Sequence, residues 1–354
     1  MGMGVQRLAA LAAGLMVGAV PVAAQMNVPR EPRPGETHIA NVRQLTQEGT
    51  QAEAYFSRDG QWITFQSTRG DHPCDLQFVM RTDGTEFRRV SPAGGKTTCG
   101  WFTNDGQRLF FGSTHTVADA CPPRPDPSKG YVWGLDPFDI YSVGRDGSGI
   151  RRITSYGVYT AEGVMSPDGR SLVFTSLKDG DLDIYTMNVD GTEVRQLTHQ
   201  VGYDGGPWWS PDGTQIVYRA YHPIDPTELK DYKDLLAQRI VRPSKMELWL
   251  MNADGSNQRQ ITQLGGANFG PSWTPDGKHI IFSSNYKNPR GPLAANFDLF
   301  TVALDGSGLT QITTDEGFDG FPMFSPDGSK LIWAGGRNAK GERDVNLFIA
   351  DWRP

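Results

Sequence analysis

The chain has 354 residues, and its 40 Asp and Glu outnumber its 34 Lys and Arg, which gives a net charge of −6. Hydrophobic residues at 38% and charged residues at 21% are typical of a protein that folds around a core. The acidic balance argues against a nucleic-acid-binding protein, and no apolar run reaches the roughly 18 residues of a membrane-spanning helix.

The N-terminus has the features of a secretory signal peptide. A single charge, Arg7, precedes the apolar stretch Leu8–Val20, which is too short to span a bilayer. The Val-Ala-Ala sequence that follows provides a cleavage site. We therefore predict a signal peptide over residues 1–24, an extended Pro-rich segment over residues 25–38, and a mature protein that is periplasmic or secreted.

A four-residue turn sequence recurs six times along the rest of the chain. It consists of Ser or Thr, a variable residue that is most often Pro, then Asp and Gly. Pro presets φ, Asp bonds to its own backbone and Gly adopts positive φ, so each copy predicts a tight turn between two strands. The copies are Ser57–Gly60, Thr103–Gly106, Ser166–Gly169, Ser210–Gly213, Thr274–Gly277 and Ser325–Gly328.

The spacing of these turns predicts the fold. Their Asp residues are 46, 63, 44, 64 and 51 positions apart, which is a base period near 44 with insertions. A second Asp-Gly turn and a closing strand such as Arg195–Thr198 follow each of the first five turns, so each unit has four strands. We predict an all-β fold, a six-bladed β-propeller of four-stranded blades over residues 39–354.

The two ends of the chain indicate how the ring closes. The sixth unit has no fourth strand after Val345–Phe348, whereas an unassigned copy of that strand, Arg43–Thr46, precedes the first unit. We therefore predict that the N-terminal strand closes the last blade, which removes two open sheet edges.

These repeats resemble the WD-like repeats of the TolB-like periplasmic propellers. The resemblance rests on Ser-Pro-Asp-Gly, Asp-Ile-Tyr, Asp-Gly and Arg-Gln-Leu-Thr in succession, and it covers the chain from about Ile39 to Trp352. It implies a periplasmic propeller that binds other proteins. TolB proteins also carry an N-terminal α/β domain, for which the short segment before Ile39 leaves no room, so functions of that domain are not expected here.

Function is expected on one face of the propeller, because variable loops on a rigid scaffold commonly carry it. The tight Asp-Gly turns all fall on the opposite face, which we call the turn face. The loop-rich face receives the connections between blades and three insertions, Thr114–Phe138, Ala220–Lys245 and Asn285–Phe297. Within the second insertion, Asp225–Arg239 has the capping residues and apolar spacing of a helix.

Aligning the six units on the Ser or Thr of the turn puts equivalent positions in register. Six residues earlier lie Gln51, Thr97, Thr160, Asp204, Asn268 and Asp319; four residues earlier lie Glu53, Cys99, Glu162, Gly206, Gly270 and Phe321. By pseudo-symmetry we expect the first ring to surround the channel mouth. Seven residues before the turn, three of the six units have an aromatic residue. With these, the candidate binding residues are Glu53, Tyr159, Glu162, Tyr203, Asp204, Asn268, Phe318 and Asp319.

Several chemistries fit this set. The carboxylates, in particular Glu162, Asp204 and Asp319, are candidate ligands for Ca²⁺, which takes six to eight oxygen ligands. The same groups suit a basic peptide group, and the aromatic residues suit a sugar. Solvated strand ends with no ligand remain an alternative, as does an acid–base pair of Asp204 with His199 or His222, which flank the fourth blade.

The three cysteines fit an oxidising compartment, but an odd number cannot all pair within one chain. We expect one disulfide that involves Cys121, with Cys99 preferred over Cys74 as its partner because Cys99 belongs to the same blade. A soft-metal cluster of these cysteines with His72 and His115 is the alternative.

No motif for nucleophilic catalysis, zinc-dependent hydrolysis or phosphate binding occurs in the sequence. We therefore predict a monomeric, non-enzymatic propeller that binds a periplasmic or cell-envelope protein, or a glycan, through its loop-rich face. The alternative is a metal-assisted carbohydrate- or lactone-processing enzyme with its site at the channel mouth.

Overall fold

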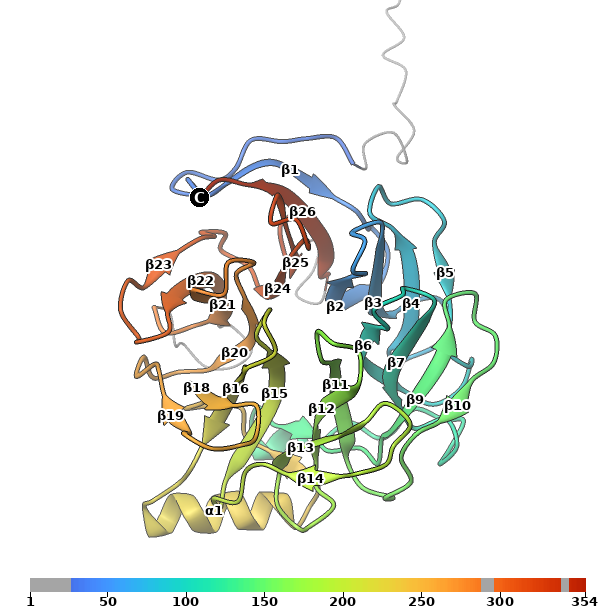
Figure 1. The fold of residues 1–354 in the computed structure, drawn as a ribbon, viewed down its shortest axis with the longest axis vertical. Helices are drawn as coiled ribbons and strands as arrows, with labels where there is room; N and C mark the ends of the chain where they lie inside the picture. The colour runs from blue at the N-terminus through green and yellow to red at the C-terminus, as the bar shows by residue number, and fades with distance from the viewer. Residues whose placement is uncertain (1–26, 288–295, 339–343) are drawn as a thin grey trace, which may run out of the picture.

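The computed structural model describes residues 27–287, 296–338 and 344–354. Their strands form six four-stranded antiparallel sheets around a common axis, which confirms the predicted six-bladed β-propeller (Figure 1). The predicted signal peptide and part of the third insertion lie outside these residues. Within the described ranges, no helix has the length and apolar character needed to cross a bilayer.

The blades follow one another along the chain, and each runs from its innermost to its outermost strand. Blade 1 contains β2 (Thr50–Phe56), β3 (Trp62–Thr68), β4 (Leu76–Arg81) and β5 (Arg88–Arg89). Blade 2 contains β6 (Thr97–Phe102), β7 (Arg108–Ser113), β9 (Asp139–Gly144) and β10 (Arg151–Arg152). Blade 3 contains β11 (Thr160–Met165), β12 (Ser171–Ser176), β13 (Asp183–Asn188) and β14 (Arg195–Gln196).

The second half of the ring has the same organisation. Blade 4 contains β15 (Tyr203–Trp209), β16 (Gln215–Tyr221), β18 (Glu247–Asn252) and β19 (Arg259–Gln260). Blade 5 contains β20 (Asn268–Trp273), β21 (His279–Ser284), β22 (Asp298–Ala303) and β23 (Thr310–Gln311). Blade 6 contains β24 (Asp319–Phe324), β25 (Lys330–Gly335), β26 (Asn346–Trp352) and β1 (Ile39–Gln44).

The N-terminal strand closes the last blade, as predicted. β1 lies along the outer side of β26 and pairs with it antiparallel, with Ile39 opposite Trp352 and Gln44 opposite Phe348 (Figure 1). The Thr that follows the closing strand makes the same hydrogen bond in blade 6 as in blade 3. Thr46 Oγ1 accepts a hydrogen bond from the Leu347 amide at 2.9 Å, just as Thr198 Oγ1 accepts one from the Ile184 amide in blade 3.

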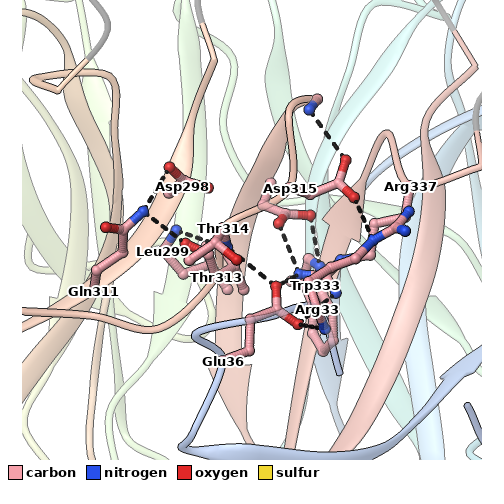
Figure 2. Close-up of polar contacts among 12 residues, drawn as sticks. Arg33, Glu36, Asp298, Leu299, Gln311, Thr313, Thr314, Asp315, Trp333 and Arg337 are labelled. Carbon is pink, nitrogen blue, oxygen red and sulfur yellow. Dashed lines mark hydrogen bonds and ion pairs between the residues drawn. The ribbon is translucent and has the colours of Figure 1, made fainter. Parts of the chain in front are cut away.

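The segment before β1 is held by a buried ion pair that the sequence patterns do not reveal. Figure 2 shows Glu36 facing Arg337, and the two side chains form a bidentate pair at 2.5 and 2.9 Å with 0% and 4% of their surface exposed. The Arg33 and Thr314 amides also donate to the Glu36 carboxylate. Arg337 reaches Asp319 at 3.1 Å as well, so the segment before β1 is tied to blade 6.

The recurring turn has a structural role in every blade. In each copy the Ser or Thr hydroxyl donates to the Asp carboxylate at 2.5 or 2.6 Å, and the amide two residues after the Asp donates to the same oxygen. These hydrogen bonds lower the pKa of the Asp carboxyls, that of Asp327 to about 2. The recurrence of Ser or Thr and of Asp in the repeat therefore follows from the hydrogen bonds that stabilise the turn.

The second insertion contains the predicted helix. Helix α1 (Pro226–Leu236) begins after Asp225, whose carboxylate accepts from the Thr227 and Glu228 amides, as expected of an N-cap. Tyr232 and Leu235 are its buried residues. A short 3₁₀ turn, η2 (Pro127–Lys129), lies in the first insertion.

The two insertions meet each other. Strand β8 (Trp133–Gly134) of the blade 2 insertion pairs with β17 (Ile240–Val241) of the blade 4 insertion. Because blade 3 lies between blades 2 and 4, this two-stranded sheet bridges the loop-rich face. We call β8, β17, α1 and η2, with their connecting loops, the cap.

The disulfide joins Cys74 to Cys121, so the preference for Cys99 as the partner is wrong. Cys74 lies in the loop between β3 and β4, and Cys121 lies in the insertion of the next blade. The insertion thus reaches back across the blade boundary, whereas Cys99 is buried in the inner strand β6 and free.

This arrangement predicts the thiol count. Protein purified without reductant should contain one free thiol, Cys99, which reacts with a thiol reagent only after denaturation because the side chain is buried. Reduction of the disulfide should lower the free energy of unfolding by about 2–4 kcal/mol. Mass spectrometry after alkylation measures the count, and three reactive thiols would contradict it.

Candidate functional site

The central channel is lined by the residues four positions before each turn. Every innermost strand has a β-bulge there, and the six residues adopt left-handed backbone conformations with φ between 52° and 61°. They are Glu53, Cys99, Glu162, Gly206, Gly270 and Phe321. Four of the six are not Gly, and each pays on the order of 1 kcal/mol for this conformation, a kind of strain that concentrates at functional sites.

An ion pair lies at the centre of this ring. Arg219 of β16 donates to the Glu162 carboxylate at 2.5 Å, and both side chains are over 90% buried. Arg219 also donates to the Tyr203 hydroxyl at 2.7 and 3.0 Å. Gly206 leaves the space that the guanidinium needs, because a Cβ at this position would lie 2.3 Å from Arg219 Nη1.

Glu53 lies beside this pair without a cation of its own. Its Oε2 atom is buried and accepts no hydrogen bond from the described residues. Burial, together with the neighbouring Glu162, raises the pKa of Glu53 to about 7, although the Cys99 thiol and Arg219 act to lower it. The chamber therefore holds a carboxyl group that exchanges its proton near neutral pH, next to a fixed ion pair.

Aromatic side chains close the chamber on both sides. On the loop-rich side, the Trp133 ring of the cap lies 5.3 Å from the Arg219 guanidinium carbon and packs against Phe269. On the turn side, Tyr55, Trp101 and Trp208 pack edge to face or tilted, with centroids 4.8 to 5.7 Å apart. The chamber between these rings measures about 30 Å³, which is room for a water or a small ion and not for a sugar.

The structure divides the predicted binding residues into two groups. Glu53 and Glu162 line the chamber, with Tyr203 buried and Tyr159 partly buried beside them. Phe318 belongs to an apolar cluster with Phe269 and Phe297. The ring six positions before the turn does not surround the channel mouth, because its side chains point into the blades: Asp204, Asn268 and Asp319 are all 0% exposed.

Each of these three buried residues has its own partners within the blades. Asp204 accepts from His222 at 3.0 Å, Asn268 accepts from Ser284, and Asp319 accepts from Trp333 and Arg337. Of the two histidines considered as partners of Asp204, His222 makes the contact, but inside blade 4 against Trp249, whereas His199 is exposed. In the described part of the chain, Glu162, Asp204 and Asp319 do not come within metal-ligand spacing of one another.

Two residues of the chamber were missed in the sequence. Arg219 lies on a second strand, which the alignment of between-blade loops did not include, although an Arg within the apolar run of β16 was a usable signal. Trp133 lies in an insertion that the other blades do not share, so the repeats do not predict its position. The pairing of β8 with β17 places it over the channel.

The cap carries a groove of about 490 Å³ on the loop-rich face. Three exposed cations line it, Arg124, Lys129 and Arg239, and none forms an ion pair with a described residue. Of its two acids, Asp136 pairs with Lys96 at 2.9 Å and Asp126 accepts the hydrogen bonds that begin η2. The groove thus carries three unpaired cations against one carboxylate, that of Asp126, without a cation partner.

A family model described as the TolB beta propeller domain matches residues 148–223. TolB of the Tol-Pal system from Francisella tularensis is 30% identical over 105 residues, which are 29% of this chain and 22% of that protein. Dipeptidyl-peptidase 5 of Porphyromonas gingivalis is 36% identical over 84 residues, 23% of this chain and 12% of that one. The matches thus span less than a quarter of either relative.

Solved structures extend the likeness to the whole fold. TolB from Acinetobacter baumannii superposes with a TM-score of 0.53 and 17% identity, covering 86% of this chain and 64% of that one. A gluconolactonase from Xanthomonas campestris has a TM-score of 0.59 and 13% identity, covering 92% and 97%. An oligogalacturonate lyase from Vibrio parahaemolyticus has a TM-score of 0.53 and 11% identity, covering 91% and 96%.

At such identities the structural likeness shows the fold alone. Together with the family-model match over residues 148–223, it shows a β-propeller fold similar to that of TolB proteins.

Proposed function

We propose that the protein is an exported, periplasmic propeller that binds an anionic partner, a protein segment or an envelope glycan, through its loop-rich face. One observation carries this proposal: two insertions from non-adjacent blades join into an ordered cap, and the groove on that cap presents three cations without ion-pair partners. Unpaired surface cations steer and bind anionic groups, more strongly at low ionic strength.

The construction of the cap supports a binding role. Ordering two long insertions costs conformational entropy, which a mere connection between strands does not require. Here the Cys74–Cys121 disulfide, the capped helix and the β8–β17 pairing all hold the insertions in one arrangement. A rigid cap presents its charged groups to a partner without a further ordering cost. The disulfide also suits an exported protein.

A triple variant tests the groove. Replacing Arg124, Lys129 and Arg239 together by Gln should reduce capture of the partner from periplasmic extract at least tenfold at low salt. The matched control removes three exposed cations from the turn side, Arg170, Arg195 and Lys278, and should leave capture unchanged. Equal capture by both variants would move the binding site away from the groove.

The alternative function is a metal-assisted enzyme with its site in the channel. The raised pKa of Glu53 favours it, because a general acid or base works best with a pKa near the working pH. A sugar would need the Trp133 side of the chamber to open. Turnover of oligogalacturonate or a sugar lactone in the presence of Mn²⁺, lost on Glu53→Gln, would establish this function instead.

A further inference from the structure

Three potential metal ligands meet where the β3–β4 loop contacts the insertion of blade 2. His72 Nε2 lies 3.4 Å from Cys74 Sγ and 3.6 Å from Cys121 Sγ. In the described ranges, these are the only three His, Cys, Asp or Glu side chains whose ligand atoms gather within 4.8 Å. All three residues are half-buried, so small reagents and ions can reach them from solvent.

We propose that reduction of the Cys74–Cys121 disulfide creates a binding site for a thiophilic d¹⁰ cation such as Zn²⁺, with both thiolates and His72 Nε2 as ligands. The distances fit this cation. With Zn–S near 2.3 Å and Zn–N near 2.0–2.1 Å, a tetrahedral site requires an N···S separation of about 3.6 Å. His72 Nε2 lies 3.4 and 3.6 Å from the two sulfurs, close to this separation, so the sulfurs must move apart to about 3.8 Å and the imidazole must turn from the Gly95 carbonyl to face the cation.

The chemistry balances with a dithiol reductant. The reductant supplies two electrons and two protons, the S–S bond breaks, and the reductant becomes a disulfide. Zn²⁺ then displaces the two thiol protons as both Zn–S bonds form. His72 Nε2 now donates to the Gly95 carbonyl at 2.8 Å, so its proton must move to Nδ1 before Nε2 binds the cation. A fourth coordination position remains for water.

The site would preserve a cross-link between blade 1 and the cap in both redox states. In the oxidised protein the disulfide holds the insertion that carries Trp133. In the reduced protein the cation would hold the same two loops together. This inference does not depend on the proposed partner binding.

Spectroscopic titration tests the site. In a Cys99→Ser background, the reduced protein should bind one equivalent of Co²⁺ with a thiolate-to-cobalt charge-transfer band, which one equivalent of Zn²⁺ abolishes. About two protons should be released for each metal bound. His72→Ala should weaken binding at least tenfold, whereas His199→Ala, which removes an exposed histidine of the same face, should not.

A second readout is independent of the spectrum. Zn²⁺ should raise the Tm of the reduced protein, EDTA should reverse this, and the oxidised protein should respond to neither. Circular dichroism confirms that each reduced variant is folded. The proposal is overturned if folded, reduced protein gives no charge-transfer band, or if His72→Ala binds metal as tightly as its parent.

Discussion

Arg337→Met should lower the free energy of unfolding by about 3–5 kcal/mol, which would be among the largest effects of a single substitution in this protein. Arg337 is 4% exposed and is the shared partner of two fully buried carboxylates, Glu36 and Asp319. Methionine fills a similar volume but leaves both carboxylates buried without their cation. Urea denaturation monitored by tryptophan fluorescence measures the change.

The matched control is Arg33→Met in the same segment. Arg33 pairs with Asp315 at 2.9 Å, but its side chain is 49% exposed, so this substitution should cost no more than about 1 kcal/mol. Adding Glu36→Gln to Arg337→Met should recover part of the loss, because it removes one of the stranded charges. If Arg337→Met and Arg33→Met destabilise equally, the buried pair does not secure the N-terminal segment.

Glu53→Gln should stabilise the protein at alkaline pH and leave it unchanged under acid conditions. The pKa of Glu53 rises from an ordinary value of 4.5 to about 7 in the folded protein. The folded state therefore holds this proton more tightly than the unfolded state, and the stability that it provides is present below pH 4.5 and lost as pH rises through 7. Glutamine stays neutral, so its advantage should grow to about 3 kcal/mol at pH 8.

The difference between the two stability curves isolates Glu53 from other carboxyls. Burial also raises the pKa of Asp183 and Asp298 to about 7, and that of Asp319 to about 6, so the parent protein loses stability over the same interval through several groups. The control is Glu193→Gln, an exposed Glu that shares the left-handed backbone conformation. If the free energy of unfolding of Glu53→Gln and of the parent changes with pH in parallel, the pKa of Glu53 is not raised in the folded state.

The fold could be predicted from the sequence because its signals are local and repeated. A Ser or Thr followed by Asp and Gly at this spacing predicts a tight turn, and six copies of it predict six blades. The Arg43–Thr46 copy of the strand that the sixth unit lacks predicts how the ring closes. The same repetition misled the site prediction. Residues in register were assumed to face the channel, but the bulge in each inner strand turns the position of Glu53 to the axis and leaves that of Asp204 inside the blade.

The rest of the site depends on contacts that no repeat encodes. The Cys74–Cys121 disulfide crosses a blade boundary, whereas membership of the same blade had favoured Cys99. Trp133 and Arg239 reach their positions through the pairing of two insertions, each of which is unique in the chain. The Glu36–Arg337 pair joins residues 301 positions apart. Periodicity carries no information on such contacts.

Closure of blade 6 by β1 also fixes the order of folding events. The first strand of the propeller pairs with the last one, and their hydrogen-bonded residues are about 300 positions apart. Closing so long a loop is entropically costly, so β1 must wait unpaired while the other blades form from local hairpins. Until β1 pairs, the outer edge of β26 stays open, and an open sheet edge can pair with a strand of another chain.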